Sequence, residues 1–261
     1  MSDVKEMILD QTSAVDHADA VRKLRQVGIA KGLWRRGDKF VHYCKGQLFK
    51  GIDFQGKTML DIGCGDGLYL IWGGIHGASR LVGLEPLLDG SGSTKNSEVV
   101  FYGMSEALNL KNIERQPFTL QEYQCAEETF DIVLLHASVN HLDESMCIEL
   151  RENAKAREIY LELFRKLRGI MKKNGQLIIV DASNRNFFGD LGMKHILYPK
   201  LAYNKHQTPF FWSKLLRQTG FDSPKVSWIS NPALGPLGWF LRNRVTSYFL
   251  ESTFRLVMTA V

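Results

Sequence analysis

The sequence contains no apolar run that approaches the roughly 18 residues a membrane-spanning helix needs, so we expect no membrane span. Residues 1–12 hold only a short apolar patch among charged side chains, and no signal peptide is predicted. Cysteine is scarce, and none of Cys44, Cys64, Cys125 and Cys147 forms a CxxC pair, which indicates neither a zinc site nor a disulfide framework. Together these absences predict a cytoplasmic protein in a reducing compartment.

A strong excess of one charge is also missing. The chain carries 33 Lys and Arg against 28 Asp and Glu, and the net charge of +5 is spread along its length. We therefore predict no nucleic-acid partner. With 44% hydrophobic and 23% charged residues among 261, the composition is typical of a folded globular chain with one large domain or two small ones.

Short apolar runs alternate with helical stretches over most of the chain. Residues 1–52 are basic and helical in spacing, and the clearest later helix is predicted over Glu144–Lys173, closed by cations and by Gly175. Strands that alternate with helices imply a doubly wound parallel sheet. The predicted strands are Thr58–Ile62, Arg80–Leu84, Ile113–Phe118, Phe130–Leu135, Gln176–Asp181, Lys225–Ile229 and Phe254–Ala260.

A glycine-rich loop follows the first predicted strand. Gly63, Gly65 and Gly67 are spaced two apart, and a helix is expected to follow them. Such a strand, loop and helix form the usual ligand-binding crossover of open α/β sheets. The dinucleotide fingerprint would place its third glycine at position 68, which is Leu68 here. The next strand ends at Glu85, a carboxylate that can accept both hydroxyls of a ribose.

The stretch Leu60–Gly67, with Glu85, resembles the first motif and the acidic second-strand end of class I S-adenosylmethionine-dependent methyltransferases. Segments 130–142, 167–181 and 211–221 resemble that family's later strands and helices in the family's order. The resemblance covers about residues 53–229 and 253–261. It implies an α/β, Rossmann-like doubly wound fold with a seven-stranded, mostly parallel sheet and helices on both faces. Outside it lies an N-terminal helical extension, 1–52, expected on the acceptor side or as a lid. The S-adenosylmethionine-binding methyltransferase domain is expected over 53–261, with insertions at about 184–207 and 230–251.

The resemblance also implies which residues hold S-adenosyl-L-methionine. Asp61 would fix the glycine loop or reach the cofactor's amino group, and Glu85 would hold its ribose hydroxyls. An Asp is common where the adenine is read, but this chain has Thr119 or the backbone of Leu120 there. The full set expected to bind the cofactor is Asp61, Gly63, Cys64, Gly65, Gly67, Glu85, Pro86, Thr119, Leu120 and His136.

Two histidines are candidates for a general base, because a hydroxyl acceptor usually needs a group that titrates near neutral pH. His141 follows the fourth predicted strand and is the first choice, with packing and capping of its loop as the alternative. His206 precedes a predicted helix and could face the acceptor, or could be an exposed loop residue. Asp181 ends the fifth strand at the ligand edge, where it could also be an N-cap.

Two sequence features that mark other classes of methyl acceptor are missing. Residues 136–139 do not form the Asn/Asp-Pro-Pro-aromatic box of enzymes that methylate amino groups on bases or glutamine, and no cluster of acidic metal ligands stands out. We therefore predict a metal-independent enzyme that methylates a small molecule, at a hydroxyl oxygen of a sugar, glycolipid or secondary metabolite. The alternative is a catalytically silent cofactor-binding module that acts through a protein partner.

Overall fold

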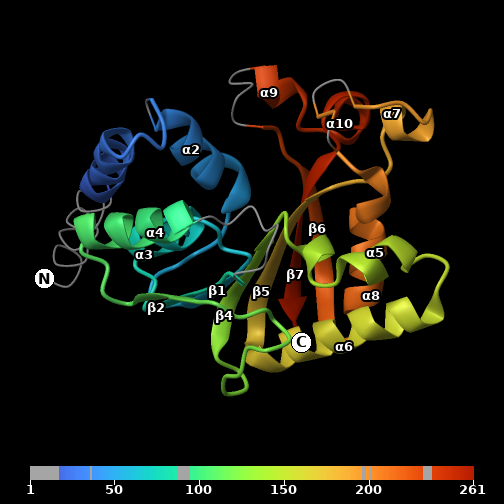
Figure 1. Cartoon of the computed structure of the whole chain (residues 1–261), viewed down its shortest axis with the longest axis horizontal. Helices are drawn as coiled ribbons and strands as arrows, with labels where there is room; N and C mark the ends of the chain where they lie inside the picture. Colours follow the sequence, from blue (N-terminus) through green and yellow to red (C-terminus); the bar gives the residue numbers. More distant parts are fainter. Residues whose placement is uncertain (1–17, 36, 87–94, 196–197, 200, 232–236) are drawn as a thin grey trace, which may run out of the picture.

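The computed structural model of the chain describes residues 18–35, 37–86, 95–195, 198–199, 201–231 and 237–261. A seven-stranded sheet in the order β3-β2-β1-β4-β5-β7-β6 forms its centre (Figure 1). Strands β1 to β5 pair in parallel, whereas β7 is antiparallel to both β5 and β6. The predicted α/β, mostly parallel sheet is therefore confirmed. The strands are β1 Thr58–Ile62, β2 Arg80–Leu84, β3 Ile113–Gln116, β4 Phe130–His136, β5 Met171–Ala182, β6 Phe221–Trp228 and β7 Thr253–Ala260.

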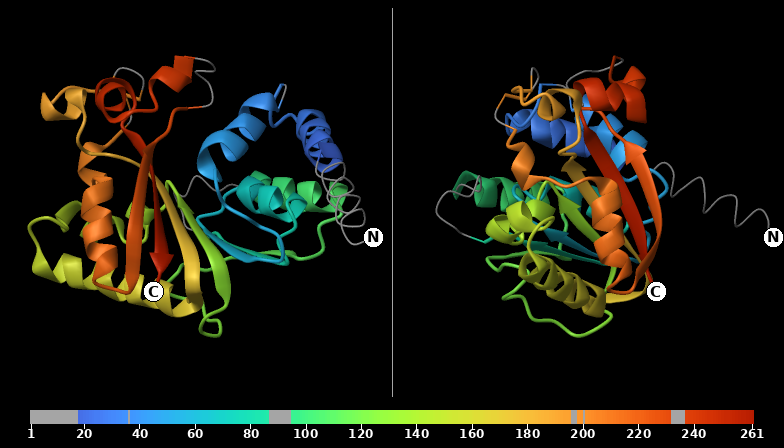
Figure 2. Two further views of the ribbon diagram at one scale, coloured as in Figure 1. Left: turned by 180° about the vertical axis from the view of Figure 1, so that it is seen from behind. Right: turned by 90° about the vertical axis from the view of Figure 1, so that its right-hand side faces the viewer.

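Helices cover both faces of the sheet, as the two views in Figure 2 show. Helix α3 and the N-terminal helices pack on one face, and α6 and α8 pack on the other. Among the described residues, no helix is long and apolar enough to cross a bilayer. The helices are 18–30, α2 Asp38–Tyr43, η1 Cys44–Leu48, α3 Leu68–Ile75, α4 Lys95–Ala107, η2 Val139–His141, α5 Glu144–Glu149, α6 Ala154–Ile170, α7 Phe187–Asp190, η3 Tyr203–Lys205, α8 Pro209–Arg217, α9 Leu237–Phe240 and α10 Arg244–Leu250.

Two apolar cores lie on the opposite faces of the sheet. Along β1, Leu60 and Ile62 enter the core under α6 and α8, whereas Met59 enters the core under α3. This division follows from the alternation of side chains along a strand. Both faces of a mostly parallel sheet are covered by helices, so its strands are apolar almost throughout.

The predicted helix over Glu144–Lys173 is wrong in two ways. The chain forms two helices there, α5 and α6, and the side chain of Asn153 caps the second by accepting hydrogen bonds from the Lys155 and Ala156 amides. Helix α6 ends at Ile170, and β5 begins at once because Met171 pairs with Phe130 of β4. The Lys-Lys-Asn-Gly segment, read as a helix stop, lies within the bounds of β5.

The predicted and observed strand bounds agree best for the first two strands of the chain. Strands β1 and β2 have the predicted bounds, but β3 ends at Gln116, two residues early, because Pro117 follows and cannot donate to the ladder. Strand β6 starts four residues before the prediction, at Phe221. That extension includes polar and exposed residues, so no apolar run signals it.

The N-terminal segment, residues 18–52, is held against the far end of the chain. The Arg255 guanidinium on β7 donates from Nε to the Leu48 carbonyl at 2.6 Å and from Nη2 to the Lys50 carbonyl at 3.1 Å. The Ser230 amide donates to Gln47 Oε1 at 2.9 Å. These contacts place the N-terminal segment beside the edge of the sheet where β4 and β5 end.

Candidate active site

The loop after β1 crosses to the end of β2. The Leu84 carbonyl accepts hydrogen bonds from the Gly63 amide at 2.8 Å and the Cys64 amide at 3.0 Å. One residue further on, Glu85 Oε2 accepts the Gly65 amide at 2.7 Å, and this carboxylate is only 8% exposed. The glycine loop and Glu85 therefore form one hydrogen-bonded unit at the carboxyl edge of the sheet.

Two loop glycines differ in what surrounds them. Gly65 has φ +52°, and a Cβ built on it meets no atom within 4 Å, so the space over this residue is open. Gly67 has φ +67°, and a Cβ there would lie 2.1 Å from the Phe101 ring. Gly67 is thus required by packing as well as by its backbone conformation, whereas the open space at Gly65 can accommodate a ligand.

Asp61 lies behind the loop and is completely buried. Neither carboxylate oxygen has a hydrogen-bond partner among the described residues. Burial, and secondarily the negative charge of Glu85, raises the pKa of Asp61 to about 8. An unpartnered buried carboxylate is costly, and a cationic or hydrogen-bonding group of a ligand would remove that cost.

The other residues expected to hold the cofactor differ in their burial and in their contacts. The Cys64 thiol packs over Gly83 of β2, and burial raises its pKa, which agrees with a small residue that fits the loop and not with a nucleophile. Pro86 is half-buried beside Glu85. The amide and the hydroxyl of Thr119 both donate hydrogen bonds to Glu122 Oε2, each at 2.9 Å. The Leu120 side chain is buried in a core, so only its backbone is available to an adenine.

A cavity of about 590 Å³ opens where β4 and β5 end. Tyr69, on the helix that follows the glycine loop, lines it, whereas the loop glycines and Glu85 are not among its lining residues. On its wall, His136 Nε2 is hydrogen-bonded to the hydroxyls of Tyr43, at 2.8 Å, and Tyr69, at 3.1 Å. Burial lowers the pKa of His136 to about 4, so its ring is neutral near pH 7. His136 thus lies at the carboxyl end of β4, and it joins the N-terminal segment to α3. Other lining residues are Trp34, Lys39, Phe40, Asp181, Tyr198, His206, Ser230, Asn231 and Glu251.

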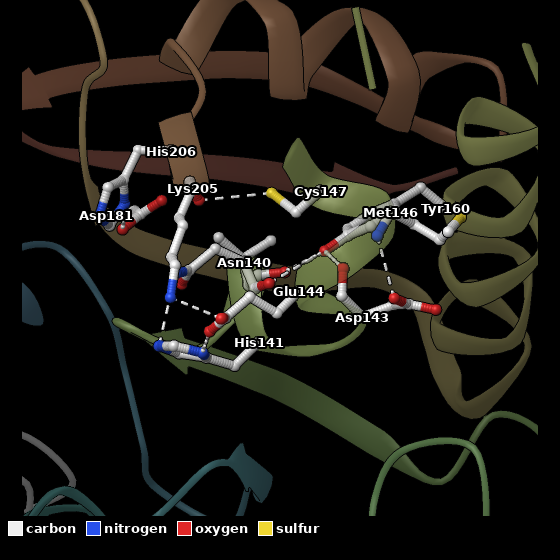
Figure 3. Close-up of polar contacts among 11 residues, drawn as sticks. Asn140, His141, Asp143, Glu144, Met146, Cys147, Tyr160, Asp181, Lys205 and His206 are labelled. Carbon is white, nitrogen blue, oxygen red and sulfur yellow. Dashed lines mark hydrogen bonds and ion pairs between the residues drawn. The ribbon is translucent and has the colours of Figure 1, made fainter. Parts of the chain in front are cut away.

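A histidine and an aspartate also meet on the cavity wall. His206 Nδ1 lies 2.9 Å from Asp181 Oδ1, and Figure 3 shows the two side chains together. Burial raises the pKa of Asp181, while His206 and the Ala182 amide act against that shift. The loop that carries His206 lies between η3 and α8, and Thr208 fixes its end by capping α8. This is the geometry of a histidine oriented by a buried carboxylate.

His141, the other candidate base, lies near this pair but does not line the cavity. Its side chain is 57% exposed, and its Nδ1 lies 2.9 Å from Glu144 Oε2. Lys205 holds the other oxygen of that carboxylate at 2.6 Å. His141 is not among the residues that line the cavity. The structure therefore brings His206, but not His141, to the cavity wall.

The sequence gives no signal for several polar residues of the cavity. Tyr69 is one of several apolar and aromatic residues on α3, and no pattern distinguishes it from the others. Glu251 is an isolated acidic residue between two predicted elements. In the structure Glu251 is buried and accepts hydrogen bonds from the Tyr198 hydroxyl at 2.9 Å and the Asn231 amide. The aromatic residues Trp34, Tyr43 and Tyr198 also line the cavity, whereas Trp239 is 67% exposed.

Comparison with known proteins agrees with this geometry. Residues 37–224, more than half of the chain, match the family model described as a methyltransferase domain. No curated protein matches the chain. An S-adenosylmethionine-dependent methyltransferase from Mesorhizobium loti shares the fold at 16% identity, over 80% of this chain and 93% of that one, with a TM-score of 0.53. One from Aquifex aeolicus does so at 15% identity, over 86% and 90%, with a TM-score of 0.52.

The residues at the loop fit the cofactor of that family. The open space at Gly65, the buried carboxylate of Glu85 and the unpartnered carboxylate of Asp61 meet at one edge of the sheet. They offer space together with acceptors for hydroxyl and amino groups. The chain belongs to the class I S-adenosylmethionine-dependent methyltransferase family, and its cofactor is S-adenosyl-L-methionine.

Proposed function

We propose that the protein methylates a hydroxyl oxygen of a small molecule that binds in the cavity beside the glycine loop, with His206 as the general base. The observation that carries this proposal is the 2.9 Å contact between His206 and the buried Asp181 on the cavity wall. A sugar, a glycolipid headgroup or a secondary metabolite has such a hydroxyl. Bound at the loop, S-adenosylmethionine supplies a methyl group on a sulfonium that is already activated for transfer.

The His206 pair directs the proton of the acceptor. Asp181 Oδ1 accepts the hydrogen on His206 Nδ1, which leaves Nε2 as the acceptor atom of the ring. The acceptor O–H would give its proton to Nε2 as its oxygen takes the methyl group from the sulfonium sulfur. The products would be a methyl ether, S-adenosylhomocysteine and a protonated imidazole. The Asp181 carboxylate stabilises that imidazolium, and the ring returns its proton to solvent.

The walls of the cavity support the same reaction. Trp34, Phe40, Tyr43 and Tyr69 contribute aromatic surface, which suits the apolar faces of a ring-shaped acceptor and keeps water from the methyl group. The volume of about 590 Å³ is in the range of small-molecule sites. Alignment of the bound acceptor in this cavity would supply much of the rate.

Metal independence is part of the proposal. The described segments contain no group of three or more His, Cys, Asp or Glu side chains placed to hold a metal ion. We also propose that the protein acts in the cytoplasm, on the basis of its cysteine usage and its sequence composition.

The test is to compare His206→Gln with His141→Gln in methyl transfer to a panel of hydroxylated metabolites. His206→Gln should lower kcat by about 10²- to 10⁴-fold, while cofactor affinity is unchanged. His141→Gln is the matched control, because its ring pairs with Glu144 outside the cavity wall, and it should keep most of the turnover.

Two outcomes would contradict the proposal. Full turnover in His206→Gln would exclude this residue as the base, and a loss confined to His141→Gln would assign the role to His141. A protein that binds S-adenosylhomocysteine but methylates no member of a broad panel would favour the silent cofactor-binding module.

A further inference from the structure

Large apolar side chains are exposed on one end of the molecule. Of the fifteen such side chains that are exposed in the described part of the chain, eight fall in two segments, 187–193 and 239–250. We call these segments together the α7–α10 face. Soluble proteins rarely leave so many large apolar groups together in water without a binding role. The eight are Phe187, Leu191, Met193, Trp239, Phe240, Val245, Phe249 and Leu250.

Helix α10 is oriented opposite to an ordinary surface helix. It buries Ser247 completely, whereas Val245 is 66% exposed and Phe249 is 45% exposed. Val245 and Phe249 are four residues apart and therefore share one side of the helix. A helix that faces water turns its apolar side inward. The reversed arrangement indicates that the outer side of α10 contacts an environment that is less polar than water.

The two segments form one surface. The Phe187 and Phe249 rings lie with centroids 5.3 Å apart, and the Tyr248 hydroxyl donates to Asp190 at 3.0 Å. The views in Figures 1 and 2 agree that α7, α9 and α10 lie beside one another at the same end of the molecule. The two segments that carry the exposed groups therefore lie side by side at one end of the molecule.

Cations accompany the apolar groups. Lys194 directly follows the first segment, and Arg242 and Arg244 lie in the second. No carboxylate of the described residues pairs with any of the three, and Arg244 lies over the Phe210 ring at 5.7 Å. The one exposed acid of these segments, Asp190, is paired with Arg185. The α7–α10 face is thus both apolar and positively charged.

We propose that the α7–α10 face docks onto an anionic lipid bilayer. Exposed Trp and Phe side chains suit the boundary between headgroups and acyl chains, and Lys and Arg beside them attract anionic headgroups. A second copy of the chain is a poorer partner, because a two-fold contact through this face would bring its unpaired cations together. The protein thus attaches to the bilayer surface without crossing it.

Docking would place the cavity at the lipid surface. Tyr198, Ser230, Asn231 and Glu251 line the cavity, and they flank the same two segments in the chain. A membrane-bound acceptor would then reach the cavity without leaving the bilayer surface, a consequence that rests on the proposed function. The docking itself does not depend on the reaction.

The experiment measures binding of the whole protein to vesicles, without acceptor or turnover. Vesicles of phosphatidylcholine are compared with vesicles that contain about one quarter phosphatidylglycerol. The protein should sediment with the anionic vesicles and much less with the neutral ones. Trp239→Ala combined with Phe240→Ala should lower the partition constant by about tenfold or more, and Lys194→Gln combined with Arg244→Gln should remove the preference for anionic lipid.

Val99→Ala combined with Tyr102→Ala is the matched control, because it removes two exposed apolar side chains from α4, outside the face. This control should bind vesicles like the wild type. Cofactor binding and melting temperature show that each variant is folded. Absence of binding to anionic vesicles would overturn the proposal, and so would equal losses in the face and control variants. A dimer in solution that Trp239→Ala with Phe240→Ala abolishes, without vesicle binding, would assign the face to a second copy.

Discussion

Replacement of Gly65 by alanine tests where the cofactor lies. The residue has φ +52°, and a Cβ on it meets no atom within 4 Å, so the methyl group enters open space above the loop. Its amide still reaches Glu85 Oε2, because an alanine keeps the N–H. The substitution therefore strains the backbone modestly and fills only the space proposed for the ligand.

The expected magnitudes separate folding from binding. A left-handed conformation costs an alanine about 1–2 kcal/mol. For a chain of this size that cost lowers Tm by roughly 2–8 °C. Cofactor affinity should fall at least about tenfold, or about 1.4 kcal/mol. Gly65→Val, with a larger side chain in the same space, should leave no measurable binding.

Gly56→Ala is the matched control. Gly56 has φ +68° and also has no atom within 4 Å of an added Cβ, but it precedes β1 and so lies at the opposite edge of the sheet. Both alanine variants should lose similar stability, and calorimetry with S-adenosylhomocysteine should show normal affinity only in Gly56→Ala. Wild-type affinity in Gly65→Ala would refute a cofactor that lies over this residue.

Three further predictions follow from the same site. Glu85→Ala removes the acceptor of the Gly65 amide and should weaken S-adenosylhomocysteine binding by about 1–3 kcal/mol in calorimetry; an unchanged affinity would exclude a role in the site. Burial lowers the pKa of His136 to about 4, so stability should be full above the unfolded pKa of about 6.5 and fall by up to about 3 kcal/mol as the pH drops to about 4. Urea unfolding across that range should show the loss in the wild type and a smaller one in His136→Gln. Methyl transfer should survive excess EDTA, and a tenfold loss that magnesium restores would instead require a metal-dependent reaction.

The sequence predicted correctly those strands whose ends are marked by the residues next to them. Strands β1 and β2 are short, mostly apolar runs bounded by loops, so their ends could be read from the residues alone. The helix over Glu144–Lys173 failed because its apolar spacing continues across a break that Asn153 creates by capping a new helix. Periodicity alone does not reveal that one helix ends and another begins within a single apolar pattern.

The sequence by itself determined the fold class, the family and the cofactor. Gly63, Gly65, Gly67 and Glu85 lie within one strand–loop–helix–strand unit, so their chemistry follows from short-range spacing.

Only the tertiary structure decided which groups meet at the acceptor cavity. Asp181 and His206 are 25 residues apart, and Tyr43 and His136 are 93 apart, yet each pair is within hydrogen-bonding distance. Parallel strands bring their carboxyl ends to one edge, and the loops that follow converge there whatever their separation in sequence. The same packing leaves the apolar side of α10 exposed, because Ser247 and not Phe249 faces the protein. Residue spacing predicts none of these contacts, because each depends on how distant segments of the chain pack against the sheet.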